Sequence, residues 1–302
     1  MPNSLKQEGL MSKSVPQVAV LLAAYNGISF LEEQLDSIVH QEAVAITIFI
    51  SVDLSSDNSY QWCCRYAKNH PQVNVLPYGN KFGGAAANFY HLIKEVNFAD
   101  FDFVALADQD DIWLKNKLSS ACNKLETDHF DAYSSNVTAF WEDGRELLIH
   151  KARPQRQYDY LFEAAGPGCT YVLRTAPMLQ FKALIQAHNQ QVAQISLHDW
   201  FIYAFFRANE QQWFIDPEPG LLYRQHLDNQ VGIHKGWQAI LKRFKLLHKG
   251  WCKQQVLNIA DLVGDHGLNL HSRLTILKNI KQLRRRHRDR WILFFIALIG
   301  LY

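Results

Sequence analysis

The amino-acid sequence predicts an α/β fold with a mostly parallel sheet flanked by helices on both faces. Three apolar runs in the first third of the chain are long enough for buried strands: Gln17–Ala24, Ala45–Val52 and Phe101–Ala107. Between the first two, apolar residues recur at helical spacing over Ile28–Val39. Strands that alternate with helices predict a parallel sheet, and ligands bind beyond the carboxyl ends of such strands.

The remaining elements are predicted from the same patterns. Asp57–Lys68 is expected to be a helix, Asn74–Leu76 a short strand, and Phe89–Val96 the apolar face of a further helix. After about residue 130 the pattern loosens. The elements expected there are a strand in Asp131–Phe140, a turn at Gly166–Thr170 that leads into a strand ending at Arg174, an aromatic-rich helix at Ser196–Ala208, a strand at Trp213–Asp216, and basic helices beyond Gly232.

Composition excludes several classes of protein. The chain has 302 residues, of which 48% are hydrophobic and 20% charged, as in a globular protein with a sizeable core. The net charge of +2 gives no general electrostatic attraction to nucleic acid. Five scattered cysteines without a CxxC pair indicate reduced thiols, and the polar segment Met1–Ser14 has no apolar core of a secretory signal. We therefore expect a cytoplasmic protein.

An acidic cluster directly follows the third apolar run. Asp108, Asp110 and Asp111 stand within four positions, and their mutual repulsion needs an offset. A dication supplies one, because Mg²⁺ and Mn²⁺ prefer carboxylate oxygens together with substrate phosphates. The alternative is that all three are solvated turn residues. Asp111 is further expected to cap a helix starting near Ile112, on which Lys117 either reaches phosphate or faces solvent.

Six segments follow one another in Val18–Gly232: VLLAAYNGISFLEEQLDSI, NKFGGAAANFYHLI, ALADQDDIWLKNKL, GPGCTYVLR, HDWFIYAFF and LLYRQHLDNQVG. In kind and order they resemble the motifs of family 2 glycosyltransferases of the GT-A fold. Within that family the resemblance is to the bacterial rhamnosyltransferase-like enzymes of surface polysaccharide assembly. The resemblance implies a Rossmann-like GT-A domain over 17–232, preceded by a polar tail (1–16) and followed by a basic and apolar helical extension (233–302).

The resemblance also assigns residues to the sugar-nucleotide donor and to a metal ion, Mg²⁺ or Mn²⁺. Asp108 and Asp110 match the family's DxD motif, and His226 matches a histidine near the diphosphate. A polar turn residue is the alternative for His226. The donor site implied by the resemblance consists of Ala24, Tyr25, Asn26, Asp53, Asn80, Gly84, Asn88, Asp108 and Gln109.

For the reaction itself, the resemblance implies that Asp199 is the general base that deprotonates the acceptor hydroxyl. The alternative is a purely structural role for Asp199 in capping a helix, because Ser196 and Asp199 have the spacing of a capping box. Core packing is an alternative for the tryptophans and is the expectation for Tyr203. The acceptor-side candidates are Trp113, Gly168, Cys169, Thr170, His198 and Trp200.

The chain departs from the family where most members have an SDDGSSD segment. Val52 replaces an aspartate and Leu54 replaces the glycine. Since leucine adopts a positive φ far less readily than glycine, we expect a different turn and less certain base contacts. A catalytically weakened scaffold or sugar-nucleotide-binding subunit is therefore the alternative to an active enzyme. The absence of Lys and Arg after the first strand argues against a nucleotidyltransferase.

The implied function is inverting, metal-dependent transfer of a sugar onto a lipid-linked or cell-surface glycan in polysaccharide or lipopolysaccharide assembly. The favoured donor is dTDP-rhamnose, and UDP-hexoses come next. The C-terminal segment bears on location, because a cluster of basic residues precedes twelve apolar residues, Trp291–Tyr302. Twelve are too few to span a bilayer, so the tail predicts an enzyme peripheral to the cytoplasmic face of the inner membrane, with packing on the domain as the alternative.

Overall fold

The structure is a computed structural model that describes residues 14–226, 250–264, 267–300 and 302. Its centre is a seven-stranded sheet with the order β10-β6-β9-β4-β1-β2-β3. All neighbours in the sheet are parallel except β9, which runs antiparallel to β4 and to β6. This confirms the mostly parallel sheet. The strands are β1 (Gln17–Ala24), β2 (Ala45–Val52), β3 (Val73–Val75), β4 (Phe103–Ala107), β6 (Ala132–Ser135), β9 (Val172–Arg174) and β10 (Trp213–Asp216).

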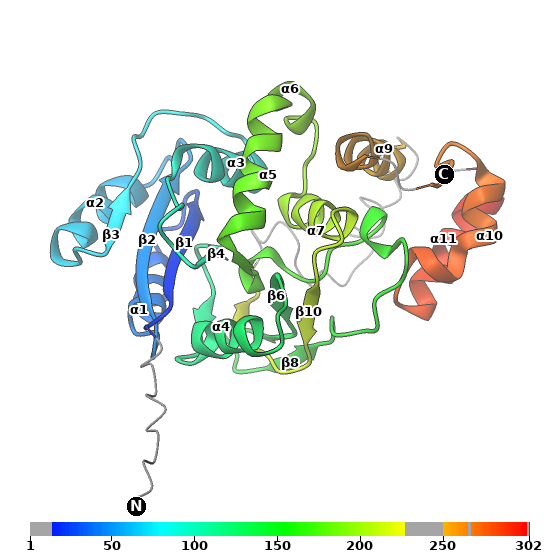
Figure 1. Cartoon of the computed structure of the whole chain (residues 1–302). Helices are drawn as coiled ribbons and strands as arrows, with labels where there is room; N and C mark the ends of the chain where they lie inside the picture. Colours follow the sequence, from blue (N-terminus) through cyan, green and yellow to red (C-terminus); the bar gives the residue numbers. More distant parts are fainter. Residues whose placement is uncertain (1–13, 227–249, 265–266, 301) are drawn as a thin grey trace, which may run out of the picture.

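Helices cover both faces of this sheet, as the alternation along β1 shows. Ala19 and Leu21 belong to one buried cluster and Val20 and Leu22 to another. Helices α3 and α7 contribute to the first cluster, and α1 and α4 to the second (Figure 1). The helices up to residue 208 are α1 (Leu31–Val39), α2 (Ser59–Asn69), α3 (Ala85–Glu95), α4 (Lys117–Thr127), α5 (Thr175–Ala187), α6 (Asn189–Val192) and α7 (His198–Ala208), with short 3₁₀ turns η1 (Asp159–Leu161) and η2 (Gly168–Thr170).

A second sheet of four strands, ordered β5-β11-β7-β8, corrects two expectations. Asp131–Phe140 is two strands rather than one, because the chain leaves the large sheet at Asn136, whose side chain bonds to Pro217, Lys151 and Ala152. Asp111 caps no helix, since the next two residues pair with β11 instead. These strands are β5 (Ile112–Trp113), β7 (Val137–Phe140), β8 (Glu146–Ile149) and β11 (Leu221–Arg224).

Among the described residues after 249, the helices are α9 (Trp251–Val263), α10 (Arg273–Leu283) and α11 (His287–Leu298). They share a core with the large sheet and its helices, because Ile259, Leu283 and Leu293 belong to the same buried cluster as Phe201 of α7. Helices α10 and α11 lie side by side at the end of the molecule away from α2 (Figure 1). The part of the predicted basic helices that falls on residues 233–249 lies outside the described residues. Within the described part of the chain, no helix is long and apolar enough to cross a membrane.

Candidate active site

Three polar segments, 25–27, 53–57 and 108–111, directly follow β1, β2 and β4 and meet at one edge of the large sheet. Ala24 at the end of β1 pairs with Val52 at the end of β2, and Leu22 pairs with Ala107 at the end of β4. The loops that follow these strands are therefore neighbours. The Gln109 amide joins two of them, because it donates to the Tyr25 carbonyl at 2.9 Å and accepts from the Tyr25 N–H at 2.7 Å.

The first of these loops is held in an unusual backbone conformation. Asn26 has a φ of 46°, a region that asparagine tolerates better than most residues. Its side-chain oxygen accepts from the Ser56 N–H at 2.8 Å, and its own N–H donates to the Ser55 hydroxyl at 3.0 Å. A Cβ at Gly27 would lie 2.3 Å from Oε1 of Gln109. A side chain at position 27 would therefore displace Gln109 from its contacts with Tyr25. Tyr25 itself is 54% exposed.

Asp53 organises a second loop over the sheet edge. Its carboxylate accepts from three backbone N–H groups: Leu54 at 2.7 Å, Phe82 at 2.8 Å and Gly83 at 2.9 Å. The Asn80 carbonyl accepts from the Leu54 N–H at 3.1 Å, which ties the same loop to the end of β2. The loop runs into Gly84, the N-cap of α3. Asp53 thus shapes the expected donor pocket, and its contact with a base stays a prediction.

The two departures from the family pattern have local explanations. Val52 is 4% exposed and belongs to the cluster beneath the sheet, so an apolar side chain suits this position. Leu54 is not among the residues with positive φ, and it is 47% exposed. The turn therefore closes through Asp53 and Asn80 without a left-handed residue. Nearby, the buried Asn88 amide donates to the carbonyls of Ser51 and Ala24, at 3.1 and 3.4 Å.

The acidic cluster lies at the end of β4 and is partly to fully buried. Burial, and then the charges of Asp110 and Asp199, raise the pKa of Asp108 to about 7. Burial raises the pKa of Asp111 well above its usual range, although hydrogen bonds from the Cys169 thiol and the Arg224 N–H oppose this shift. The charges of neighbouring carboxylates add to burial in disfavouring ionisation of Asp108 and Asp111.

His226 reaches this cluster from the end of β11, as its assignment required. Its Nε2 lies 2.7 Å from Oδ2 of Asp110, and its ring stacks on Phe30 with 4.8 Å between centroids. Arg224 donates to the Asp110 carbonyl at 2.9 Å and pairs with Glu33 on α1. Asp110 is therefore positioned from two sides by β11. The structure brings Asp110 and His226 into contact, and Asp110 lies close enough to Asp108 for its charge to raise the pKa of Asp108.

The ligand atoms gathered at the end of β4 fit a hard divalent cation. Asp108, Asp111 and Cys169 have ligand atoms within 4.8 Å of one another. The Cys169 thiol is a soft ligand, which suits Mg²⁺ and Mn²⁺ less well than carboxylate oxygens do. The oxygen ligands remain, and oxygen ligands are what Mg²⁺ and Mn²⁺ prefer. Asp111 adds one more carboxylate to this set than the family resemblance assigned to the metal.

Asp199 stands on the first turn of α7 and faces the same region. Its Oδ1 accepts from the Trp200 N–H at 2.8 Å, and burial raises its pKa to about 6. The N-cap of α7 is Leu197, and Ser196 makes no side-chain cap, so the predicted capping box is wrong. His198 is stacked on Phe89 with 4.0 Å between centroids. Burial lowers its pKa to about 3, so His198 is neutral near pH 7.

The glycine-containing turn before β9 packs directly against α7. A Cβ at Gly168 would lie 2.7 Å from Nε2 of His198 and 3.3 Å from Cβ of Asp199. Thr170 closes the turn by donating to the Pro167 carbonyl at 2.7 Å. Cys169 is fully buried beneath the acidic cluster. This turn therefore links the acidic cluster to Asp199.

The large aromatics are mostly core residues. Tyr203 is fully buried, as expected. Trp113 is 3% exposed, with the Lys117 ammonium 3.4 Å from its ring centroid, and Trp200 donates from its indole to the Tyr160 carbonyl at 2.8 Å. Their burial matches the core alternative for both tryptophans, and contact with an acceptor stays a prediction.

Two lysines lie near the site: Lys117, whose role the sequence left open, and Lys151, which was not identified from the sequence. Lys117 is buried rather than solvated, its ammonium has no hydrogen-bond partner among the described residues, and burial lowers its pKa to about 7. Burial also lowers the pKa of Lys151, whose charge in turn favours ionised Asp199. No motif in the sequence points to Lys151, because it comes from the loop after β8, almost fifty residues before Asp199.

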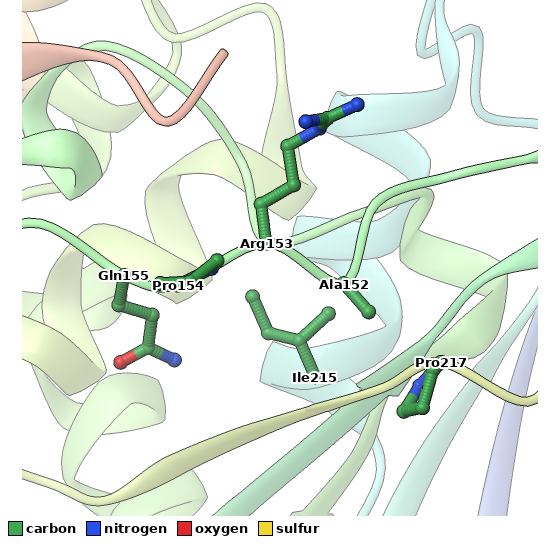
Figure 2. Close-up of a pocket in the computed structure, with 6 residues that line it drawn as sticks. All are labelled: Ala152, Arg153, Pro154, Gln155, Ile215 and Pro217. Atoms are coloured by element: carbon green, nitrogen blue, oxygen red, sulfur yellow. The ribbon is translucent and has the colours of Figure 1, made fainter.

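A cavity of about 350 Å³ lies elsewhere, beside the end of β10. Figure 2 shows the loop before η1 on one side of it and Ile215 and Pro217 on the other, with the Arg153 guanidinium extended away from Ile215. None of the predicted site residues lines this cavity. The residues that line it are Ala152, Arg153, Pro154, Gln155, Ile215 and Pro217.

Comparison with known proteins agrees with this geometry. The family described as "Glycosyl transferase family 2" matches residues 19–186. The dTDP-rhamnosyl transferase RfbG of Shigella flexneri is 40% identical over 289 residues, which cover 93% of this chain and all of that protein. The match therefore includes the segments that hold Asp199 and His226.

Solved structures share the fold at low sequence identity. TarS 1–349 of S. aureus in complex with UDP-GlcNAc has a TM-score of 0.54 and 13% identity, covering 94% of this chain and 80% of that one. The mannosyltransferase PcManGT of Pyrobaculum calidifontis, in complex with GDP-Man and Mn²⁺, has a TM-score of 0.50 and 16% identity, covering 96% and 86%. The sheet, the strand-end acidic cluster and these matches lead to one conclusion: the chain belongs to glycosyltransferase family 2 and is an enzyme of glycosyl transfer.

Proposed function

We propose that the protein transfers rhamnose from dTDP-rhamnose, with inversion, to a hydroxyl of a lipid-linked or cell-surface glycan in bacterial polysaccharide assembly. The observation that carries the proposal is the placement of an ionisable carboxyl, Asp199, within electrostatic reach of Asp108 in the acidic cluster. A base and a diphosphate site on one edge of the sheet are what such a transfer needs. The full-length similarity to RfbG supports the choice of donor.

The chemistry assigns a role to each side of the site. Asp199 accepts the proton of the acceptor hydroxyl as its oxygen attacks the anomeric carbon, and the bond between that carbon and the diphosphate breaks on the opposite face. A divalent cation, held by Asp108 and Asp110 with His226 and Asp111 close by, would neutralise the charge on the leaving diphosphate. Tyr25, Asn26 and the loop that Asp53 holds would contact the nucleotide.

The donor is tested by nucleoside diphosphate release from dTDP-rhamnose and from UDP-hexoses, with Mg²⁺ or Mn²⁺ and with a chelator. We expect turnover of dTDP-rhamnose that the chelator abolishes. Asp110→Asn should lower turnover by two orders of magnitude or more, roughly the worth of a group that stabilises charge in the transition state. The matched control is Asp100→Asn, since Asp100 is exposed and precedes β4 at the opposite edge of the sheet.

Two results would count against the proposal. Turnover of a UDP-hexose in place of dTDP-rhamnose would leave the reaction class intact and overturn the donor. Failure to bind any donor in calorimetry with metal present would favour the scaffold alternative, in which the acidic cluster serves no transfer.

We further propose that the helical extension (233–302) holds the enzyme at the cytoplasmic face of the inner membrane, where a lipid-linked acceptor would lie. Part of α11 turns apolar side chains outward: Trp291 is 62% exposed, Phe295 55% and Ile299 65%. Between residues 273 and 300 the chain has eight Lys or Arg residues and one acidic residue. An apolar face flanked by positive charge fits an anionic lipid surface.

Not all of this positive charge is available to lipid. Arg285 and Arg290 are 6% and 8% exposed and bond to backbone carbonyls of the protein itself, whereas Lys281 and Arg288 are exposed. Fewer basic side chains are therefore available to contact lipid than the basic cluster in the sequence contains.

Flotation with vesicles tests the docking face. The wild-type chain should float with vesicles that contain phosphatidylglycerol and stay behind with pure phosphatidylcholine. The double variant Trp291→Glu/Phe295→Glu should lose most of this binding. Leu147→Glu/Leu148→Glu is the control, because these leucines are similarly exposed but lie on β8. Equal flotation of both double variants would reject the α11 face, and a concentration-dependent dimer lost in the first variant would assign that face to a second copy of the chain.

A further inference from the structure

The elbow between α10 and α11 lies against the loop that carries the glycine turn. This loop, residues 163–171, is called the acceptor loop below. Arg285 stands in the middle of the elbow and is 6% exposed. A guanidinium so deeply buried needs several partners, because its desolvation is costly.

Arg285 finds most of its partners in the acceptor loop. Its N–H donates to Oε1 of Glu163 at 2.6 Å, and its guanidinium lies 3.4 Å from the same carboxylate. The guanidinium also donates to the carbonyls of Ala164 and Ala165. Within the described part of the chain no other donor reaches either carbonyl. Arg285 therefore fixes three consecutive residues at the start of the loop.

The far end of the loop contacts the residue assigned as the base. The Tyr171 hydroxyl lies 3.2 Å from the carbonyl oxygen of Gly166 and 3.2 Å from that of Asp199. Gly168 packs so closely on α7 that a Cβ there would clash with His198. A displacement of the loop would therefore move the first turn of α7.

Charge balance alone does not account for Arg285. The buried carboxylate of Asp159 lies 3.4 Å from the Arg285 guanidinium, but Arg207 is closer, at 3.2 Å. Arg207 also donates to the Tyr203 hydroxyl at 2.6 Å, which in turn donates to Asp159 at 3.1 Å. Asp159 thus keeps a cation and a hydroxyl without Arg285. The contacts peculiar to Arg285 are those with the acceptor loop.

We propose that Arg285 is a positioning residue: it holds the acceptor loop against α7 and so sets the place of Asp199 relative to the acceptor. The inference rests on the proposed function in so far as Asp199 is the base. It gives the C-terminal extension a part in the reaction that is separate from any contact with lipid.

The experiment compares Arg285→Lys with Arg207→Lys in the full-length chain. Lysine keeps the charge but loses the planar fork that reaches two carbonyls at once. In the Arg285 variant we expect amide hydrogen exchange in residues 164–171 to rise about tenfold, and kcat for dTDP-rhamnose hydrolysis to fall about 10- to 100-fold with KM for the donor unchanged. The Arg207 variant should change neither quantity, since it disturbs the same buried carboxylate without touching the loop.

Two further measurements keep the outcome decisive. In Arg285→Ala, methylguanidinium should restore part of kcat, which a general loss of packing would not allow. If that variant does not fold, Glu163→Gln weakens the contact between Arg285 and the acceptor loop from the other side. It should raise hydrogen exchange in the loop and lower kcat, both by less than Arg285→Lys does. Unchanged exchange in the loop, or parallel changes in the Arg207 variant, would overturn the inference. If wild-type protein turns over no donor, the proposed function fails, and the exchange comparison alone decides the positioning.

Discussion

The carboxyl group of Asp199 is kept in surroundings that disfavour its charge. Burial raises its pKa to about 6, and the opposing contributions come from the Trp200 N–H and from the charge of Lys151. The ionised form that a general base requires is therefore populated near neutral pH but at a cost to folding. Such a balance is common at catalytic carboxylates.

Loss of Asp199, the proposed base, should be visible as a change in both rate and pH dependence. In the wild type, kcat for donor turnover should fall about tenfold per pH unit below about pH 6, because protonated Asp199 accepts no proton. Asp199→Asn should lower kcat by roughly 10²–10⁴ and abolish this acid limb. A stopped assay of diphosphate release between pH 5 and pH 8 measures both.

The stability of the same variant provides the control. A folded-state pKa raised above the unfolded value means that protonation stabilises the fold, so this stabilisation is present below about pH 4 and is lost as the pH rises through about 6. Asparagine carries no charge to bury. Asp199→Asn should therefore be more stable than the wild type at pH 8, by up to about 3 kcal/mol, and equal to it near pH 4. A variant less stable at pH 8 would show that Asp199 is mainly structural.

Residues that follow strands were predictable, and residues paired across the fold were not. The positions of Tyr25, Asp53 and Asp108 follow from apolar runs that end where polar side chains begin, and parallel strands bring such ends together. The neighbours of Asp199 and Asp159 have no such pattern. Lys151 and Arg285 reach them from loops far away in sequence, and a lone basic residue in a loop gives no signal of its partner.

At the scale of elements, the turn η2 joins the acidic cluster to α7, and Gly168 is its tightest point. In Gly168→Ala the new methyl group would meet the His198 ring at 2.7 Å, so either η2 or α7 must shift. We expect kcat to fall about 10- to 100-fold while donor affinity, measured by calorimetry, stays within about twofold.

The same turn offers its own control. A Cβ at Gly166 would meet the Ser135 carbonyl oxygen at 3.4 Å, which is ordinary contact. Gly166→Ala should therefore leave kcat nearly unchanged. Equal effects of the two substitutions would mean that the turn needs glycine for its backbone rather than for its contact with α7.

Strands with strong apolar patterns were predicted to the residue, whereas strand β5 was missed. The bounds of β1 and β2 agree with the sequence prediction because each is a long, mostly apolar run, and the bounds of the shorter β10 agree as well. Strand β5 was taken for the start of a helix. Its two residues are extended because they pair with β11, more than a hundred residues later, and no local pattern encodes that partner.

For the whole molecule, the C-terminal segment shows why an apolar sequence does not by itself reveal its partner. Along α11, Leu293 and Ala297 face the protein core, whereas Trp291 and Phe295 face outward. Both faces are apolar, so the sequence pattern suited membrane contact and packing equally well. In the structure, one face of α11 packs on the core and the opposite face is exposed to solvent.

This division predicts that removing the extension would not simply release the enzyme from lipid. Deletion of residues 251–302 would expose the surface that α9–α11 cover and would take away buried apolar side chains of the shared core, each worth roughly 1.5–3 kcal/mol. Four of them already approach the total stability of a typical domain. The truncated chain should therefore unfold at least 10 °C lower than the wild type, or fail to fold, in thermal scans followed by circular dichroism.

The surface variant separates the two roles of the same segment. Trp291→Glu/Phe295→Glu alters exposed side chains alone, so its melting temperature and its donor turnover in detergent-free solution should equal those of the wild type while vesicle binding is lost. A truncated chain that melted like the wild type would mean that α9–α11 form an independent appendage. In that case the contacts of Arg285 with the acceptor loop would contribute nothing to the stability of the catalytic domain.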